Sequence, residues 1–575
     1  MESGEPKRVD AAIIGAGICG LVAARSYLRL RPEANVLILD SDKTVGGVWS
    51  KDRLYPALVT QTELGLFNYS DMPMAPKNWD GRKSIVTGQM VHDYLHKYSE
   101  EHDLLRRIRF NSFVTSAKQC ARGWRLELRD SNDIIEAEKL IVAPGYASIP
   151  NIPQTFDDAS IPIIHSRDLG ASLDALQDAQ KVIVVGAAKS GFDATYTMLK
   201  MGKEVEWVIR PDGSGPMPLL PFKIGFLWTM STVATRFLAY MNPSIFNTSG
   251  LWYWLLQRNP LGRWCVDRFW DFLAYVSGRE AGYGAGDHIA LLKPDLDHQG
   301  ILAAPAAVGL CPAPDFWPTL HSKNLHIARD AIRTIKEKTI YLKSGETTTA
   351  DCVIMCTGWG DHLGMFDAEH KTKIGIPVDN EYDLTEQKVR RSGSIDWSHY
   401  DEAAEKAVDA KLPSVARPPK SKHPELQDPR LQKKWRLWRR VVPVELAAQG
   451  DRSLVLLGQM TNAYTPVTAE VQAFWAVVYL LGELDVPDMP TMATEVAEFN
   501  AFTRKRYFNQ GQRSQYALWD YLNYIGVLFG DLGLNSYRKS NAFAELFSPY
   551  RASDFNGFVD EYLEKRELKR VGRKL

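Results

Sequence analysis

The chain has few cysteines, and their spacing excludes several kinds of site. Six cysteines occur among 575 residues, with no CxxC pair and no Cys/His spacing suited to a metal ion. We therefore expect neither a redox dithiol nor a metal centre. The N-terminus also lacks a signal-peptide pattern, which predicts a reduced, cytoplasmic protein.

Net charge and long apolar runs are missing as well. The 69 basic residues balance the 69 acidic ones, and no basic stripe is interleaved with aromatic residues. We therefore expect no nucleic acid partner. The longest uncharged stretch, residues 237–257, is interrupted by Asn-Pro-Ser and Asn-Thr-Ser-Gly, so it cannot form a continuous membrane-spanning helix.

Motifs that perform catalysis with side chains alone are absent too. The chain contains no Gly-x-Ser-x-Gly elbow and no HExxH motif. His92 and His96 share one helical face, but such a pair without a third ligand is more often structural. The sequence therefore predicts that a bound cofactor carries the chemistry.

Two glycine fingerprints dominate what is present. Gly15-Ala-Gly17-Ile-Cys-Gly20 lies between an expected strand over residues 9–14 and an expected helix over residues 18–30, and Gly186-Ala-Ala-Lys-Ser-Gly191 follows a similar apolar run. Glycine permits the tight strand-to-helix bend and lets backbone N–H groups approach a pyrophosphate at the helix N-terminus. Two such turns predict two bound dinucleotides, and chemistry between dinucleotides is usually redox chemistry.

The residue that ends the next strand indicates which dinucleotide each turn binds. Asp40 follows the strand expected over 36–39, where a carboxylate binds free ribose hydroxyls, as suits FAD or NAD. Arg210 follows the strand expected over 205–209, where a guanidinium favours the phosphate of NADPH. A solvated charge at the strand end is the alternative for Arg210. Ala188 replaces the middle glycine of the second fingerprint, and its methyl group limits close approach of the cofactor.

Further motifs resemble those of the flavin-containing monooxygenase family, of the class B flavoprotein type. Gly46-Gly47-Val48-Trp49 is similar to the family's Gly-Gly-x-Trp, and Lys189-Ser190 with Asp193-Ala194 is similar to its Gly-x-x-Lys-Ser-x-x-Asp-Ala variant. Fungal secondary-metabolism members of the family are the most similar. The other matching residues are Ala143-Pro-Gly145 and Cys356-Thr357-Gly358-Trp359, which resemble strand ends, and Gly458, Pro466, Glu470, Gln472, Trp475 and Gly482, which resemble the segment closing over the flavin.

Two departures from the family pattern bear on the reaction. The signature Phe-x-Gly-x-x-x-His-Ser survives only as Phe156 and His165-Ser166 with longer spacing, and the longer form typical of Baeyer–Villiger relatives is not visible. The family's Thr-Asn, whose asparagine lies near the reactive edge of the flavin, is Thr60-Gln61 here. Gln61 keeps the amide and adds a methylene, so the resemblance implies that Gln61 is the catalytic residue.

The resemblance implies FAD at the first turn and NADPH at the second. It also implies electron transfer from NADPH to FAD, oxygen addition to give a C4a-hydroperoxyflavin, and delivery of one oxygen atom to a hydrophobic small molecule, with O2 as co-substrate. The expected cofactor-binding residues are Gly15, Ala16, Gly17, Ile18, Cys19, Gly20, Asp40, Gly47, Val48, Trp49, Thr60, Gln61, Val114, Gly145, Gly186, Lys189, Ser190, Gly191, Arg210, Thr357, Gly358, Gly458 and Gln472.

The order of these signals predicts an α/β fold with two Rossmann-like, doubly wound domains. The NADPH domain is inserted in the FAD domain, which we expect to resume at the apolar strand over 351–355. The expected divisions are 1–166 for the first FAD part, 167–345 for the NADPH domain with an aromatic helical insertion over 216–300, 346–500 for the second FAD part with a polar surface insertion over 367–436, and 501–575 for a C-terminal helical extension.

The aromatic segment over 216–280 has two interpretations. Its tryptophans either form the core or lid of a helical subdomain, or they touch a membrane surface as interfacial Trp and Tyr do. The aromatic and basic C-terminal segment offers a second place for such contact. Periodicity in one sequence does not decide which face is exposed.

Two other functions stay open from the sequence. One is an NADPH-dependent flavin reductase or oxidase that inserts no oxygen, although the missing dithiol argues against a thioredoxin-reductase-like enzyme. The other is a catalytically weak flavin-binding scaffold, raised by Ala188 and Gln61.

Overall fold

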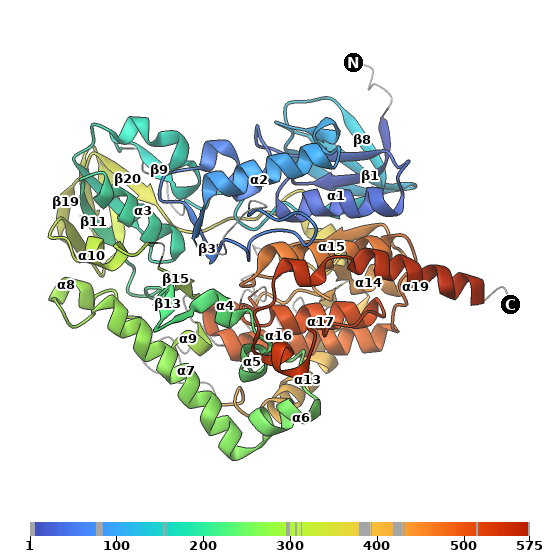
Figure 1. Cartoon of the computed structure of the whole chain (residues 1–575). Helices are drawn as coiled ribbons and strands as arrows, with labels where there is room; N and C mark the ends of the chain where they lie inside the picture. The colour runs from blue at the N-terminus through green and yellow to red at the C-terminus, as the bar shows by residue number, and fades with distance from the viewer. Residues whose placement is uncertain are drawn as a thin grey trace.

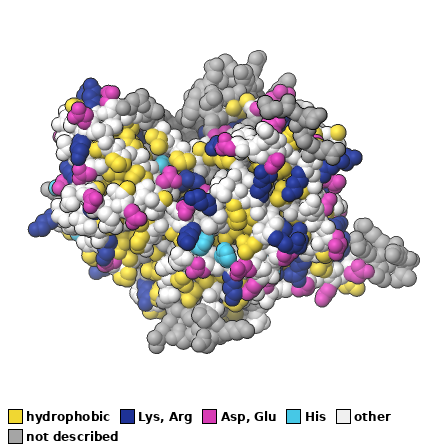
Figure 2. Space-filling view, turned by 90° about the horizontal axis from the view of Figure 1, so that it is seen from above, with side chains coloured by type: hydrophobic (Ala, Val, Ile, Leu, Met, Phe, Trp, Pro, Cys, Tyr) yellow, Lys and Arg dark blue, Asp and Glu magenta, His cyan; other side chains and the backbone are white. Residues whose placement is uncertain are grey.

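The structure is a computed structural model of the whole chain. It describes residues 6–572, except 76–83, 153–155, 157, 295–299, 305–306, 312, 379–390, 393, 418–427, 429–431 and 513–515. Two sheets lie side by side above a large helical region, and the C-terminal helix lies on the side of the first sheet (Figure 1). Seen from above, Lys and Arg side chains alternate with Asp and Glu over the surface (Figure 2).

The first sheet has seven strands and contains the first glycine turn. Its central strands pair in parallel, and β6 and β7 add an antiparallel edge. Along β1, Ala11 and Ile13 face one core while Ala12 and Ile14 face another, as the two-residue period of a strand requires. The order is β5 (Ile108–Arg109), β2 (Val36–Leu39), β1 (Lys7–Ile14), β8 (Ile134–Val142), β7 (Gly123–Leu128) and β6 (Val114–Cys120), with β25 (Leu454–Leu456) paired to β8.

The helices α1 (Ile18–Leu30) and α15 (Thr465–Leu480) pack together on one face of this sheet. The sequence prediction of α1 over 18–30 and of β2 over 36–39 is confirmed at both ends. Every residue of α15 after Thr465 is buried, so this helix lies inside the protein on all of its sides. Beside them, α2 (Gly88–Glu101) follows the short hairpin of β3 (Val59–Glu63) and β4 (Ile85–Thr87).

The second sheet has five parallel strands and contains the second glycine turn. Helices α3 (Lys189–Lys200) and α10 (Phe316–Leu320) cover one face. A three-stranded antiparallel sheet of β17 (Ile332–Lys336), β18 (Thr339–Leu342) and β19 (Thr347–Thr349) covers the other. The strand order is β16 (Leu325–Ala328), β11 (Glu204–Val208), β10 (Lys181–Val185), β20 (Cys352–Met355) and β9 (Ile163–His165).

The predicted return to the first sheet over 351–355 is wrong. β20 pairs in parallel with β10 and β9, so it is a central strand of the second sheet. Residues 363–376 then pack against the first sheet, and the strand that joins it is β25. A short apolar strand buried on both faces fits either sheet, so its sequence does not tell them apart.

Helices from three parts of the chain form the lower region. The first group lies within 216–310. It includes a π-helical turn at Trp254–Arg258 and the small pairings β12 (Leu219–Leu220) with β15 (Gly309–Leu310) and β13 (Lys223–Ile224) with β14 (Leu227–Trp228). Its helices are α4 (Thr229–Val233), α5 (Arg236–Met241), α6 (Gly250–Tyr253), α7 (Pro260–Ala281), α8 (Asp287–Ala290) and α9 (Gly300–Ala303).

The segment over 367–436, expected at the surface, is partly buried. Helix α13 (Ser398–Lys411) packs on α16 (Met489–Gln512), and Trp397, Ala404, Val408 and Leu412 belong to the core. Most of the basic run after Arg417 lies outside the described residues. The remaining elements of this part are α11 (Ala368–Lys373), β21 (Arg391–Ser392), β22 (Ile395–Asp396), β23 (Leu437–Trp438), β24 (Val442–Pro443) and α14 (Val444–Ala448).

The C-terminal part is helical and packs on the insertion. Its helices are α16 (Met489–Gln512), kinked at Tyr507 and Phe508, α17 (Tyr521–Asp531), α18 (Ala542–Phe547) and α19 (Phe558–Gly572). No helix in the described ranges is long and apolar enough to span a membrane.

Candidate active site

One cavity of about 1290 Å³ opens between the two sheets and the helical region. Both glycine turns line it, together with residues from α4, from β15 and from the C-terminal part. All of the predicted site residues line this cavity except Ala16, Gly20 and Gly191. The chain therefore brings segments from 14 to 519 around a single space.

The first turn shows which glycines the fold itself requires. A Cβ on Gly15 would lie 2.3 Å from the Ala143 carbonyl oxygen, and a Cβ on Gly20 would lie 1.8 Å from the Gly15 oxygen. These two glycines let α1 approach β1 and β8. Gly17 differs, because its Cβ would meet nothing closer than the Gly47 Cα at 3.6 Å. Gly17 therefore leaves open space at the mouth of the turn that the chain itself does not use.

Asp40 is held by the turn that it faces. Its carboxylate accepts hydrogen bonds from the backbone N–H groups of Ala16 at 2.5 Å and Asp42 at 2.8 Å. Burial raises the pKa of Asp40, and these hydrogen bonds oppose that rise. Asp40 lines the cavity and each of its oxygens has a second lone pair, so it can also accept from a ribose hydroxyl.

The second turn repeats the geometry of the first. A Cβ on Gly186 would lie 2.3 Å from the Cys356 oxygen, and one on Gly191 would lie 2.0 Å from the Gly186 oxygen. The exposed Ala188 stands at the N-cap of α3, at the position that Gly17 has in α1. Neither helix has a side-chain cap or an acidic residue in its first turn. No side chain of the helix itself therefore competes with a phosphate at either N-terminus.

Charged side chains around the second turn differ in burial. Lys189 bonds to the buried carboxylate of Asp193 at 2.5 and 2.6 Å, and Tyr55 also bonds to Asp193. Arg210 lies at the cavity edge with its side chain 66% exposed, and its nearest carboxylate, that of Asp212, is 3.9 Å away. Arg210 is therefore available to an anion entering from solvent.

Gln61 lies on β3 and contacts the insertion. Its Oε1 accepts a hydrogen bond from the backbone N–H of Leu310 on β15 at 3.1 Å. β15 runs beside β12, which ties this contact to the helical insertion. Gln61 lines the cavity, and its amide also carries an NH2 group with two donors.

The matching C-terminal segment is a strand followed by α15, as its motif implies. Gln472 accepts from the Gly458 N–H at 3.0 Å and donates to the Tyr524 hydroxyl at 2.7 Å. Two residues earlier, the buried Glu470 accepts two hydrogen bonds from Ser70, both at 2.8 Å. Burial raises the pKa of Glu470 to about 7.

The altered signature around His165 is structural. His165 donates from Nε2 to the Gly358 carbonyl at 2.9 Å and accepts at Nδ1 from the Arg167 N–H at 3.1 Å. It thereby fixes the loop after β20 against β9. His92 contacts the Trp49 carbonyl at 3.1 Å and so supports the Gly46–Trp49 loop. Among the described residues, no three His, Cys, Asp or Glu side chains gather as a metal site would need.

Sequence reasoning missed an ion cluster beside the first turn. Asp42 pairs with Arg53 at 3.0 Å and with Arg167 at 2.8 Å, and all three line the cavity. Burial lowers the pKa of Arg53. The position of Asp42, two residues after Asp40, was the one available signal. Arg53 and Arg167 are far apart in the sequence and carry none.

One part of the cavity wall has no charged side chain among the described residues. It consists of residues from 217–233, 307–310, 460–472 and 516–519, and the charged lining residues all lie outside these ranges. The Tyr516 hydroxyl accepts from the Val308 N–H at 3.2 Å, which joins the insertion to the C-terminal part. The residues on this wall include Leu220, Thr229, Met230, Val233, Val308, Leu310, Met460, Thr461, Leu518 and Trp519.

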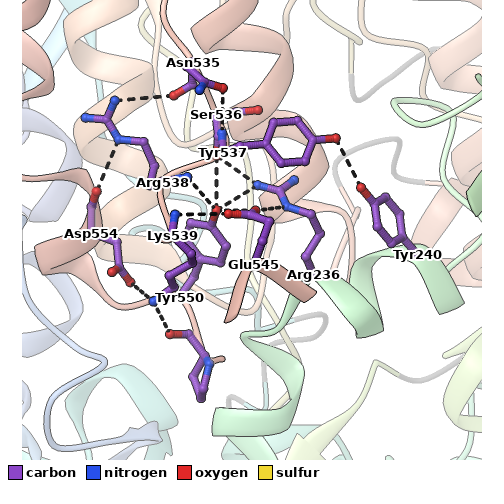
Figure 3. Close-up of polar contacts among 11 residues, drawn as sticks. Arg236, Tyr240, Asn535, Ser536, Tyr537, Arg538, Lys539, Glu545, Tyr550 and Asp554 are labelled. Atoms are coloured by element: carbon purple, nitrogen blue, oxygen red, sulfur yellow. Dashed lines mark hydrogen bonds and ion pairs between the residues drawn. The ribbon is translucent and has the colours of Figure 1, made fainter. Parts of the chain in front are cut away.

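The C-terminal part holds this wall in place. The carbonyls of Val233 and Ala234, at the end of α4, accept from the Tyr521 hydroxyl at 3.2 Å and the Tyr550 N–H at 2.7 Å. On α5, the buried Arg236 pairs with Glu545 and donates to the Ser536 carbonyl at 2.9 Å (Figure 3). The walls of the cavity therefore depend on contacts that span about 300 residues of sequence.

Comparison with known proteins supplies a family. A model of pyridine nucleotide-disulphide oxidoreductases matches residues 12–218. The FAD-dependent monooxygenase DEP4 of Alternaria brassicicola is 39% identical over 97% of this chain and 95% of its own length. The FAD-dependent monooxygenase resA of Aspergillus sclerotiorum is 34% identical over 98% of this chain and 99% of its own length.

A solved structure shares the fold at low identity. The open crystal structure of cyclohexanone monooxygenase aligns with a TM-score of 0.56 over 91% of this chain and 97% of that chain, at 15% identity. The α/β fold expected from the sequence is thus a fold that a flavin monooxygenase adopts.

Proposed function

Because the chain belongs to the FAD-dependent monooxygenase family defined by these relatives, we propose that it binds FAD and NADPH and inserts one oxygen atom of O2 into a neutral, hydrophobic small molecule. The observation that carries this proposal is the single cavity shared by two phosphate-binding turns and an uncharged wall. By analogy with the fungal relatives, the reaction belongs to secondary-metabolite biosynthesis.

The residues of the first turn fit FAD. The space at Gly17, which a Cβ would enter without a clash, suits a pyrophosphate lying against the uncapped first turn of α1. Asp40 lies where a ribose would follow. When bound, FAD supplies the chemistry of the reaction, because it accepts electrons from NADPH and activates O2.

The residues of the second turn fit NADPH with one restriction. The uncapped first turn of α3 can hold a phosphate, and Arg210, whose side chain is 66% exposed and 3.9 Å from the Asp212 carboxylate, can pair with a 2′-phosphate. The methyl group of Ala188 occupies space that stays open at Gly17. We therefore expect NADPH to bind less tightly than FAD.

The chain's own contribution is orientation and selection against charged substrates. Gln61, held through its oxygen by Leu310, presents amide donors from β3 and can stabilise negative charge that develops on oxygen. The uncharged wall provides no ion-pair partner for a charged substrate. An ammonium or carboxylate buried there would lose its hydration without compensation.

The test compares neutral and charged substrates of similar shape. Purified protein containing FAD is given NADPH, O2 and an apolar ketone, thioether or alkene, or a carboxylate or ammonium analogue of each. We expect oxygenated product from neutral compounds, with less H2O2 per NADPH consumed, and no such change with the charged analogues. H2O2 equal to NADPH with every compound would identify an oxidase, and NADPH use without O2 would identify a reductase.

A further inference from the structure

Helix α7 is unusual because large apolar side chains lie on both of its sides. Its inner side contributes Val266, Trp270, Leu273 and Ala281 to the interior. Its outer side exposes Leu261, Trp264, Phe272 and Tyr275, which are 69%, 59%, 50% and 63% exposed. A helix at the surface of a water-soluble domain normally turns charged and polar residues outward.

The outer residues form one stripe. Leu261, Trp264, Arg268, Phe272, Tyr275 and Arg279 follow one another at intervals of three or four residues, so they lie on one side of the helix. We call these six residues the outer stripe. Leu251 and Trp254, just before α7, are also exposed, at 73% and 57%. In Figure 1, α6 and the first part of α7 lie at the lower end of the molecule, and α7 runs from there toward α8 and the second sheet.

The segment that contains the outer stripe, residues 221–293, has a net positive charge although the whole chain is neutral. Residues 221–293 contain seven Lys and Arg against four Asp and Glu, whereas the chain has 69 of each. The charged members of the outer stripe are Arg268 and Arg279. Asp271 pairs with Arg268 at 2.6 Å. The Asp271 side chain is mostly buried, whereas the Arg268 side chain is 59% exposed.

We propose that the outer stripe, with Leu251 and Trp254, binds the surface of an anionic lipid bilayer with α7 parallel to it. Trp and Tyr favour the interface between headgroups and acyl chains, Leu and Phe enter the acyl boundary, and arginine attracts anionic headgroups. The stripe is the outer surface of one helix rather than a groove, which suits a flat, deformable partner. A second copy docked through the same stripe would bring four arginines together.

This contact does not depend on the oxygenation reaction. The same insertion supplies the cavity wall through α4 and β15. Binding at the bilayer would therefore bring that wall close to apolar molecules dissolved in lipid.

Sedimentation with vesicles tests the proposal on the full-length, FAD-containing protein. We expect binding to vesicles of phosphatidylcholine with roughly one third phosphatidylserine, weaker binding to pure phosphatidylcholine, and loss of the difference at high salt. The double variant Trp254→Ser/Trp264→Ser should lower the partition constant about tenfold to a hundredfold. Arg268→Gln/Arg279→Gln should lower it about tenfold to thirtyfold on anionic vesicles and little on neutral ones.

Leu568→Ser is the matched control, because Leu568 is 71% exposed on α19, far from α7. It should bind vesicles as the wild type does. Thermal unfolding of each variant checks that the fold is kept, and the arginine variant repeats the test if the tryptophan variant does not fold. Failure of the wild type to sediment with anionic vesicles would overturn the proposal. So would a dimer, measured by light scattering, that Trp254→Ser/Trp264→Ser dissociates.

Discussion

Gly17→Ala separates the needs of the bound cofactor from the needs of the fold. Gly17 has φ −88° and ψ −169°, which any residue adopts, and its new Cβ would lie 3.6 Å from the Gly47 Cα. The free energy of unfolding of the cofactor-free protein should change by less than about 1 kcal/mol. The methyl group would displace a pyrophosphate from the α1 N–H groups and remove about one charge-assisted hydrogen bond. That loss is about 1.5–3 kcal/mol, or roughly tenfold to a hundredfold in FAD affinity.

Gly20→Ala is the comparison variant, because its Cβ would lie 1.8 Å from the Gly15 oxygen. That overlap forces α1 away from β1 and should prevent stable folding. Three measurements are made on each variant. The visible absorbance of the purified protein gives its FAD content, quenching of flavin fluorescence gives the FAD affinity, and circular dichroism follows thermal unfolding. Wild-type FAD affinity in Gly17→Ala would refute the assignment of this turn to the pyrophosphate.

Three further predictions follow from single residues. Arg210→Ala should raise KM for NADPH about fivefold to thirtyfold and leave KM for NADH nearly unchanged, because only NADPH carries the 2′-phosphate; equal effects on both coenzymes would remove Arg210 from that site. Gln61→Leu should keep the rate of NADPH-driven flavin reduction within about twofold while raising H2O2 per NADPH, since the amide donors are lost and the volume is kept; an unchanged H2O2 yield would make Gln61 a packing residue. Burial raises the pKa of Glu470 to about 7 in the folded protein, from 4.5 for an exposed side chain. Stability present at low pH should therefore fall by up to about 3 kcal/mol as pH rises from about 4.5 to 7, and Glu470→Gln should remove that slope in denaturant titrations.

The sequence predicted individual helices and strands well where several local signals follow one another. The bounds of α1 and β2 follow from an apolar strand, a glycine turn and a helical period in immediate succession. Residues at turns and strand ends, such as Asp40 and Gly186, line the common cavity because the carboxyl ends of parallel strands lie at one edge of a sheet.

The sequence did not predict contacts between distant segments. β20 belongs to the second sheet, where it pairs with β10. Which strand it pairs with depends on the neighbouring strands in the fold, and a four-residue apolar run carries no information about them. The hydrogen bond from Leu310 to Gln61 joins residues 249 apart, and the contact of Tyr516 with Val308 joins residues 208 apart. The sequence did not predict the outer stripe of α7 for another reason. This helix has large apolar residues on both sides, so their periodicity does not identify which side is buried.

Isotope labelling during turnover tests the central claim most directly. Purified protein is incubated with NADPH, ¹⁸O2 and a fraction of neutral, apolar metabolites extracted from the organism that makes the protein. The masses of the products are then measured by mass spectrometry. We predict an NADPH-dependent product that contains one ¹⁸O atom, with product and H2O2 together equal to the NADPH consumed. NADPH oxidation whose electrons all appear in H2O2, with no ¹⁸O in any metabolite, would contradict the assignment as a monooxygenase.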